Sequence, residues 1–306
     1  MKGRVYFGTG AVQHVYQNTH NGFLIFYSVR DCLVFFTVFM VVARRHRVRV
    51  LGLCFMADHI HVLIEADSRE DLFRFVQHYT AWFTELWNTR HGQSGSLFRG
   101  PFGFASKVSE KAIRSAIAYL FNNPVEKRMA TRPELARWNF MPYAISRYPF
   151  SEPIRKEFAG YALRSALKEV DFACKTGRPL SYVTLDRLSA KLTPEEQQQL
   201  CDYIISAYSI IDYERTISYY GSYENMVMAV NTAKGSEYDI REEFSPGSDT
   251  VYSRMSGLLI KEGIISDVDQ LLLLPEERRL ELLEPLALAT GAGERKTAKY
   301  LHLRIE

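Results

Sequence analysis

Cysteine is scarce in this sequence, and its few cysteines lie far apart. They are Cys32, Cys54, Cys174 and Cys201, and no two of them form a CxxC pair. This spacing argues against a zinc ribbon and against a disulfide-bonded scaffold, because both need paired cysteines. It is typical of proteins from a reducing compartment, and we therefore expect a cytoplasmic location.

Long hydrophobic runs are also missing. The longest run, CLVFFTVFMVVA from Cys32 to Ala43, has 12 residues and is followed by the charged stretch RRHRVR. A helix that spans a bilayer needs about 20 apolar residues, so we interpret the run as a buried helix and expect no membrane association. The first ten residues, MKGRVYFGTG, have no apolar segment of the kind found in signal peptides.

Charge is distributed unevenly along the 306 residues. Residues 1–150 hold 19 Lys and Arg against 10 Asp and Glu, whereas residues 151–306 hold 19 against 25. A basic front half is compatible with a surface that binds a polyanion, and equally with a solvated surface that has no partner. Length and charge together predict two domains, at residues 1–150 and 151–306.

Hydrophobic periodicity predicts alternating strands and helices in the front half. We expect a strand, a turn and a second strand in HVYQNTHNGFLIFYS, a helix after it, and two strands within residues 47–66. A helix begins after Ser68 and stops at Gly92, a Gly-rich loop follows, and another helix ends at Pro124. The order predicts an α+β fold: a ferredoxin-like antiparallel sheet with helices on one face, followed by a mostly α-helical C-terminal domain.

Helical patterns dominate the second half. Thr193 with Glu196 forms a capping-box pattern, and the end of the chain reads as two short helices around Gly291–Gly293. This matches helix-turn-helix geometry near residues 280–303, although two short helices around glycine occur in any α-helical domain.

Two histidines one residue apart are the main candidates for chemistry. His59 and His61 lie in the alternating run MADHIHVLIEAD, so both side chains point to one face of the strand, which we expect to be open. Two imidazoles about 7 Å apart along a strand, two residues at roughly 3.3 Å each, can bind one divalent ion. An isolated pair of this kind is nonetheless more often two half-exposed strand histidines.

A second candidate lies in the stretch AIAYLFNNPVEKR. Tyr119 and Asn123 are four residues apart and therefore share a helix face. Tyr119 could be packing, and Asn123 before a proline could be a helix C-cap. Alternatively, the amide oxygen of Asn123 is a third, hard metal ligand beside the two imidazoles, with Tyr119 one turn away.

At this point the sequence resembles a known family. The segments HVYQNTHNGFLIFYSVRDCLVFF, LGLCFMADHIHVLIE, YTAWFTELWNTRHGQSGSLFRGPF and AYLFNNPVEKRMA occur in the order seen in HUH single-tyrosine (IS200-like) transposases. The similarity is closest to the REP-associated tyrosine transposases, and it covers roughly residues 10–145. This chain has Ala57-Asp58 where the family more often has Pro-Asn, which puts an extra carboxylate beside the first histidine.

The resemblance implies a site and an activity. His59 and His61 match the metal ligands of the family, Tyr119 matches the nucleophile, and Asn123 is matched to the third ligand, with Asn122 as the neighbour that could replace it. It implies a metal-dependent transposase, with Mg²⁺ or Mn²⁺, that nicks and rejoins single-stranded or hairpin DNA through a 5′-phosphotyrosine intermediate. A host-domesticated enzyme and a homodimer both fit the family.

Basic residues that could contact DNA phosphates lie in three places: Arg99 and Lys107 in and after the Gly-rich loop, Arg44 and Arg45 after the first helix, and Arg295, Lys296 and Lys299 near the end of the chain. The alternative function is a non-catalytic DNA-binding regulator that keeps the fold. Retention of the two histidines with Tyr119 and Asn123 favours the enzyme, whereas the acidic second half keeps the regulator in consideration.

Overall fold

The computed structural model describes residues 7–155, 157–233 and 250–304. Its strands are β1 (Val12–Asn18), β2 (Val48–Met56), β3 (His59–Ala66) and β4 (Gly103–Lys107). Its α-helices are α1 (Val29–Arg45), α2 (Arg69–His91), α3 (Glu110–Glu126), α4 (Tyr161–Lys175), α5 (Tyr182–Ser189), α6 (Pro194–Tyr208), α7 (Tyr213–Ser218), α8 (Tyr223–Thr232), α9 (Thr250–Lys261), α10 (Glu276–Glu281), α11 (Leu283–Thr290) and α12 (Glu294–Leu301). Short 3₁₀ segments include η1 (His20–Gly22) and η6 (Val268–Leu273).

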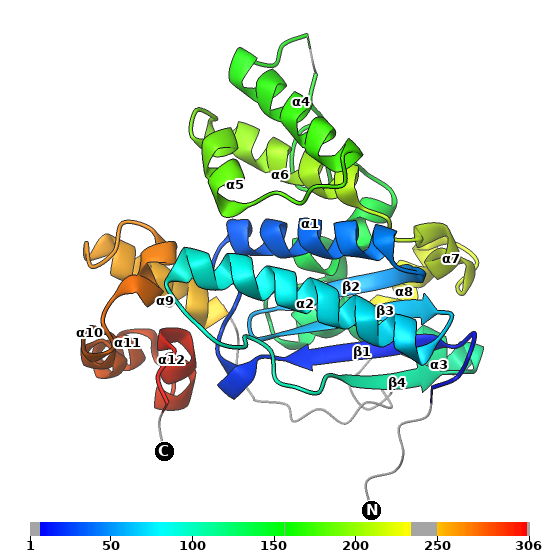
Figure 1. Cartoon of the computed structure of the whole chain (residues 1–306), viewed down its shortest axis with the longest axis horizontal. Coiled ribbons are helices and arrows are strands. Elements are labelled where there is room, and N and C mark those ends of the chain that lie inside the picture. The colour runs from blue at the N-terminus through cyan, green and yellow to red at the C-terminus, as the bar shows by residue number, and fades with distance from the viewer. Residues whose placement is uncertain (1–6, 156, 234–249, 305–306) are drawn as a thin grey trace, which may run out of the picture.

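The strands form one antiparallel sheet in the order β2-β3-β1-β4 (Figure 1). With α1 between β1 and β2, and α2 between β3 and β4, this is the ferredoxin-like arrangement. The predicted α+β class and the helical second half are therefore confirmed. Strand β3 lies between β2 and β1, in the interior of the sheet.

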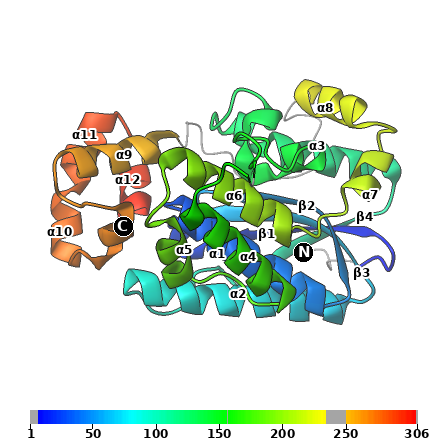
Figure 2. The same ribbon diagram turned by 90° about the horizontal axis from the view of Figure 1, so that it is seen from above.

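Helices cover both faces of the sheet, whereas the sequence predicted helices on one face only. Val15, Leu53 and Val62 pack into the core that contains α1 and α2. Leu63 and Cys54 pack into a second core with α3 on the opposite face. Because β2 and β3 are apolar at successive positions, both of their faces need cover, and the helix after β4 supplies the second layer. Figure 2 shows α3 and its neighbour α8 on the opposite side of the molecule from α2.

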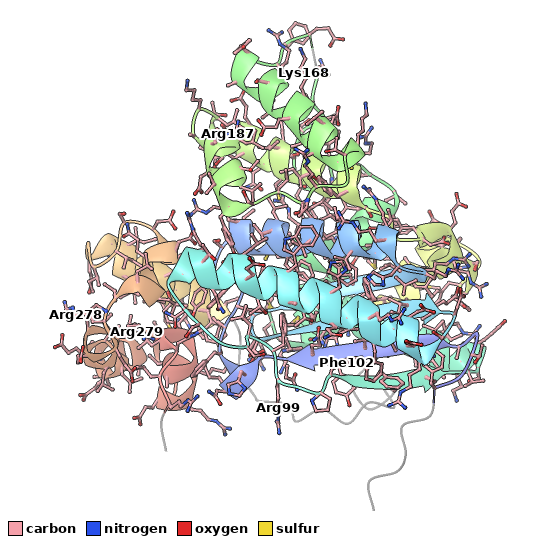
Figure 3. All side chains as sticks on the ribbon, in the orientation of Figure 1. Arg99, Phe102, Lys168, Arg187, Arg278 and Arg279 are labelled. Carbon is pink, nitrogen blue, oxygen red and sulfur yellow. The ribbon has the colours of Figure 1, made fainter. Side chains whose placement is uncertain are left out.

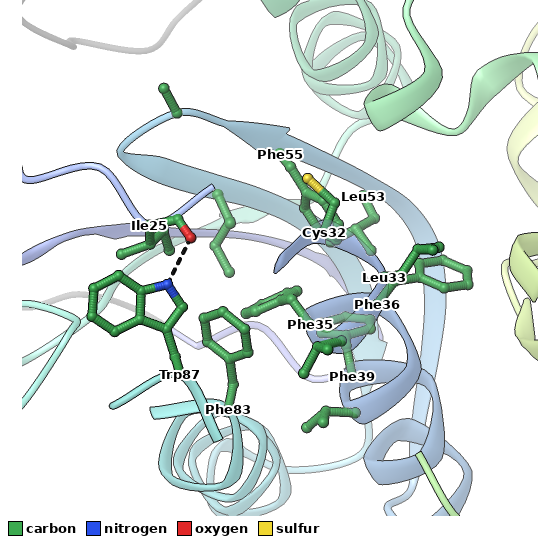
Figure 4. Close-up of a cluster of buried hydrophobic side chains, with 14 of the residues drawn as sticks. Ile25, Cys32, Leu33, Phe35, Phe36, Phe39, Leu53, Phe55, Phe83 and Trp87 are labelled. Atoms are coloured by element: carbon green, nitrogen blue, oxygen red, sulfur yellow. Dashed lines mark hydrogen bonds between the residues drawn. The ribbon is translucent and has the colours of Figure 1, made fainter. Parts of the chain in front are cut away.

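Helix α1 is buried along nearly its whole length. Phe35 and Phe39 face the sheet and α2, and Figure 4 shows them among the rings of Phe55 and Phe83. The other side of α1 is covered by α5 and α6 (Figure 1). A helix that is apolar all round is expected in such a central position, which explains the long hydrophobic run read from the sequence.

Two of the expected local elements are different in the structure. The second strand expected near Phe23–Tyr27 is neither strand nor helix. Leu24 and Ile25 are both buried there, whereas in a strand with one buried face successive side chains alternate between buried and exposed. The backbone N–H of Ile25 donates a hydrogen bond to the carbonyl of the turn residue Ala57. Conversely, the expected Gly-rich loop contains β4, a short edge strand that pairs with β1.

The helix limits agree better with the sequence. Ser68 caps α2 by accepting a hydrogen bond from the backbone of Asp71, and Gly92 ends the helix in the left-handed conformation. The capping box of Thr193 and Glu196 is present at α6. Helix α3 instead continues past Pro124 to Glu126, because a proline in the last turn removes only one hydrogen bond.

The C-terminal helices dock beside the ends of α1 and α2. His302, at the end of α12, stacks on Phe23 and Trp87 and hydrogen-bonds the carbonyl of Leu24 through Nε2 at 2.7 Å. Helices α11 and α12 flank the expected turn, in which Gly291 is left-handed. Within residues 7–155, 157–233 and 250–304, no helix is long and apolar enough to cross a membrane.

Gly103 is required by the close approach of β1 and β4. A Cβ atom at this position would lie 2.0 Å from the ring of Tyr16. We expect Gly103→Ala to lower the free energy of unfolding by about 1–3 kcal/mol, because the ring has to leave its place. Gly257→Ala, at a helical position with nothing within 4 Å, is the control and should be neutral or stabilising. Urea unfolding measures both, and equal effects of the two substitutions would contradict the assignment.

His302 predicts a pH dependence of stability. Burial lowers the pKa of His302 to about 4 from 6.5. As the pH falls from about 6.5 to about 4, the unfolded chain gains a proton here that the folded chain does not, so stability decreases. His302→Gln should remove this contribution, which reaches roughly 3 kcal/mol. Unfolding curves at several pH values test this prediction. The difference in free energy of unfolding between wild type and variant should change between about pH 6.5 and pH 4. A difference that stays constant over this range would contradict it.

Candidate active site

The two predicted histidines share one face of β3. Ile60 and Val62 point into the core with α1 and α2, so His59 and His61 point to the opposite face, like Leu63. That face is not open as the strand pattern suggested, because α3 packs on it. His61 is fully buried and His59 is half-buried. The helix that covers them is the one that carries Tyr119.

Tyr119 lies directly against the histidines. Its ring centroid is 5.3 Å from that of His61 and 5.8 Å from that of His14, with an edge-to-face geometry in both cases. The rings of His59 and His61 are 5.0 Å apart. Helix α3 and strand β3, which are about 60 residues apart in the sequence, therefore bring a phenol and two imidazoles together. Tyr119 is only 1% exposed.

The two asparagines that follow on α3 differ in their surroundings. Asn122 donates a hydrogen bond from Nδ2 to the carbonyl of Ala233 at 3.4 Å. Asn123 is 2% exposed, and its Oδ1 accepts no hydrogen bond from any residue in the described ranges. Burying an amide oxygen without a hydrogen bond costs about 1–3 kcal/mol of folding free energy. Such an oxygen is suited to coordinate a cation. Asn123 therefore offers the better third donor of the two.

Asp58 interacts directly with the first histidine. Its Oδ1 lies 2.7 Å from Nδ1 of His59, and its Oδ2 lies 3.4 Å from Nζ of Lys299 on α12. Burial alone would raise the pKa of Asp58, but the hydrogen bond and charge of His59, together with Lys299, lower it to about 2. Asp58 is thus an anion at neutral pH and can accept a hydrogen bond from Nδ1–H of His59.

His14 on β1 contacts Nδ1 of His61, as Asp58 contacts Nδ1 of His59. The sequence analysis did not identify His14. Its Nε2 lies 3.1 Å from Nδ1 of His61. Burial, with a smaller effect from Lys107, lowers the pKa of His14 to about 3. Burial, followed by the charges of neighbouring histidines, holds the pKa of His61 well below its ordinary value. Both rings are therefore neutral. His14 could have been found only from the strand pairing, which sets Tyr16 opposite His61 and His14 two residues further along.

The two contacts have one chemical consequence. If Nδ1 of each histidine donates its proton, to Asp58 and to His14 respectively, the lone pair of each imidazole is on Nε2. Outer partners that fix the tautomer in this way are typical of histidines that bind metals. The two lone pairs would then lie on the face of the sheet that is covered by α3, the helix that carries Asn123.

The basic residues proposed from the sequence are divided between two sides of the sheet. Arg99 donates its backbone N–H to Asn18, the residue paired with His59, and its side chain is exposed (Figure 3). Lys107 is largely buried and acts on His14, and Lys299 contacts Asp58. Lys107 and Lys299 therefore act on the two residues that contact the histidines, and the backbone of Arg99 lies next to the strand residue that pairs with His59.

The other basic residues are placed differently. Arg44 and Arg45 lie at the end of α1, across the sheet from α3, and donate to the carbonyls of Tyr208 and Gly177. Arg295 is exposed on α12, and Lys296 lies over the ring of Tyr252. The structure therefore does not bring Arg44 and Arg45 to the histidines.

The tautomer of His59 depends on Asp58 and can be measured. We expect the metal-free protein at pH 8 to show His59 protonated at Nδ1, because the carboxylate of Asp58 accepts a hydrogen bond from that N–H group. Asp58→Ala should shift the ring toward the Nε2-protonated form, whereas Asp67→Ala, at the exposed far end of β3, should not. Nitrogen-15 NMR shifts of the imidazole report the tautomer directly. An unchanged spectrum in Asp58→Ala would contradict this role.

Comparison with known proteins is consistent with this geometry. Residues 30–122 match the family described as transposase IS200 like. A solved structure of a REP-associated tyrosine transposase bound to a REP hairpin is similar at 13% sequence identity and a TM-score of 0.40, covering 52% of this chain and 92% of that one. No curated protein matches this chain. The matched segment 30–122 contains His59, His61 and Tyr119.

Proposed function

We propose that this protein is a metal-dependent transposase that cuts and rejoins single-stranded or hairpin DNA through Tyr119. The observation that carries the proposal is the contact of the Tyr119 ring with His61, in a site where Asp58 and His14 set the tautomers of both strand histidines. A tyrosine buried only for packing needs no such arrangement.

The donor atoms fit the divalent ion that the family implies. Nε2 of His59, Nε2 of His61 and Oδ1 of Asn123 would hold Mg²⁺ or Mn²⁺, and the two nitrogen donors favour Mn²⁺. When bound, the ion would supply Lewis-acid polarisation of the scissile phosphate. Asp58 and His14 would keep the two rings oriented and their Nε2 lone pairs available.

Tyr119 would be the nucleophile. Its Oη attacks phosphorus, so that an Oη–P bond forms, the bond from phosphorus to the 3′ oxygen breaks, and a 5′-phosphotyrosine results. The phenol loses a proton and the departing 3′ oxygen gains one, which leaves a 3′-hydroxyl. A 3′-hydroxyl of another strand reverses the step and rejoins DNA without a nucleotide cofactor. A phenol has an ordinary pKa of about 10, so a polarised phosphate is required.

Arg99, Lys107 and Lys299 are the residues we assign to the DNA backbone near Tyr119, because each is placed next to a residue that contacts or pairs with His59 or His61. Arg295 and Lys296 on α12 would extend this surface, and α11 with α12 would form the proposed helix-turn-helix. Arg44 and Arg45 would contact DNA only away from the site. We also propose that the protein is a host-domesticated enzyme and that it forms a homodimer. Measuring its mass in solution tests the homodimer.

The burial of Tyr119 adds one requirement. At 1% exposure, its phenol cannot reach a phosphate unless the residues around it move. Met226 and Val230 of α8 belong to the same core as Tyr119. We infer that DNA cleavage includes a step in which the site opens, and that the observed arrangement is closed.

The decisive change is Tyr119→Phe. Incubated with labelled single-stranded hairpin DNA and Mn²⁺, the wild type should form a covalent adduct that survives denaturing electrophoresis, and Tyr119→Phe should form none. Tyr16→Phe is the matched control, since Tyr16 lies on the same face of the sheet and its ring is 6.0 Å from that of His14. It should keep the adduct, although a moderate loss of rate is compatible with its position.

Two results would contradict the proposal. An adduct that persists in Tyr119→Phe would move the nucleophile elsewhere. DNA binding without any adduct in Mg²⁺ or Mn²⁺ would support the alternative, a non-catalytic DNA-binding regulator.

A further inference from the structure

Helix α4 presents an outward face that is both basic and aromatic. Leu163 and Val170 bury the inner side of the helix, which packs on α5 and α6. Figure 1 shows α4 on the outside of the molecule, and Figure 3 shows Lys168 on this outer helix. At 3.6 residues per turn, five exposed side chains share an arc of about 80° opposite the buried side. We call them the α4 face: Tyr161, Arg164, Lys168, Phe172 and Lys175.

The α4 face carries positive charge only, although the second half of the chain is acidic overall. Its three cations are exposed and form no ion pair with a carboxylate of the described residues. The two acidic residues of α4 lie outside the face and are engaged elsewhere. Glu169 pairs with Arg187, and Asp171 accepts a hydrogen bond from the Tyr203 hydroxyl at 2.7 Å. The charge of the α4 face is therefore available to an anionic partner.

The basic surface continues from α4 onto the end of α1. The guanidinium group of Arg178 lies 5.9 Å from the centroid of the Phe172 ring. Arg45 donates a hydrogen bond to the carbonyl of Gly177, in the turn after α4, at 2.8 Å, and its neighbour Arg44 is exposed as well. A hydrogen bond to a carbonyl leaves the charge of a guanidinium group in place. Arg44 and Arg45, which lie away from the histidines, therefore extend the α4 face.

Two aromatic rings are exposed among these cations. Tyr161 is 82% exposed and Phe172 is 59% exposed. Proteins bind unpaired nucleotides with this combination, because cations neutralise the phosphates and rings stack on the bases. Duplex DNA keeps its bases stacked inside, so it would use the cations but not the rings. From Tyr161 to Lys175 the face is about 21 Å long, enough for about six nucleotides at 3.4 Å each.

A membrane surface is also anionic, but it fits the α4 face less well. A helix that lies in a membrane surface inserts a continuous apolar face between the lipids. The apolar face of α4 is already buried against the protein, and its outward face has two rings with Lys168 between them. The arrangement of charge and rings therefore favours a single-stranded nucleic acid.

We propose that the α4 face, with Arg178 and the end of α1, binds a single-stranded segment of DNA outside the Tyr119 site. The proposal rests on the proposed function only in taking DNA as the partner. Helix α1 packs on one face of the sheet and α3 packs on the other, and α4 is joined to α1 through α5 and α6. The α4 face and Tyr119 therefore contact different segments of the strand, and the α4 face holds DNA that flanks the bond to be cut.

Binding of a single strand to a protein that forms no covalent link tests the role of the charges. The probe is a fluorescent oligo-dT strand of about 20 nucleotides, and anisotropy measures its affinity for full-length Tyr119→Phe protein. We expect Arg164→Gln/Lys168→Gln in this background to weaken binding at least about tenfold in about 50 mM salt. The slope of log affinity against log salt should fall by about 1.4, because two phosphate contacts are lost. Arg254→Gln/Lys261→Gln, which removes two exposed cations from α9, is the matched control and should bind like the parent.

The exposed rings distinguish a single strand from a duplex. Tyr161→Ala/Phe172→Ala should weaken binding of oligo-dT at least about tenfold and leave the affinity for the matching duplex nearly unchanged. Photo-crosslinking of a strand that contains 5-bromouracil, followed by mass spectrometry, should give a peptide linked at Tyr161 or Phe172. Because all four substituted side chains are exposed, the variants should fold, and circular dichroism checks that they do.

The proposal is overturned if the α4 variants bind oligo-dT as tightly as the α9 control, or if no crosslink forms on α4. It is also overturned if these variants lose binding to anionic phospholipid vesicles but keep their affinity for DNA, which would assign the face to a membrane. Formation of the covalent adduct by the wild type is measured separately. A normal adduct together with unaffected binding by the α4 variants would reject this surface while leaving the proposed transposase activity intact.

Discussion

The pairing of β3 with its two neighbours is the constraint on which the site depends. Because side chains alternate along a strand, a slip by one residue would turn His59 and His61 into the core of α1 and α2. The register is fixed by apolar residues on both faces, with Val62 in one core and Leu63 in the other. Packing of α3 on the second face then brings Tyr119 to His61.

The histidines become a site only through neighbours from other elements. Asp58 lies in the turn before β3 and His14 lies on β1. Each of them faces the Nδ1 atom of one histidine. Lys299 extends the first of these contacts to the C-terminal helices. The acidic second half of the chain therefore packs against the first half near the histidines, since Lys299 on its last helix contacts Asp58.

Part of this was predictable from sequence. Strand alternation gave the common face of His59 and His61, and helical spacing with the family motif indicated Tyr119. What was missed depends on contacts between distant segments. His14 has no motif and acquires its role from the pairing of β1 with β3. Strand β4, which begins at Gly103, is rich in small residues and exists because β1 offers an unpaired edge. The side of the sheet taken by α3 follows from two-sided burial, which periodicity alone does not reveal.

The central claim is that Tyr119 is the residue that becomes linked to DNA. The most direct measurement is mass spectrometry of the protease-digested covalent complex, which identifies the peptide and the residue that carry the 5′-phosphate. The account predicts a single modified tyrosine, at position 119, in a peptide from α3. A phosphate on Tyr16 or another residue, or the absence of any nucleotide-linked peptide under conditions in which DNA is cut, would contradict it.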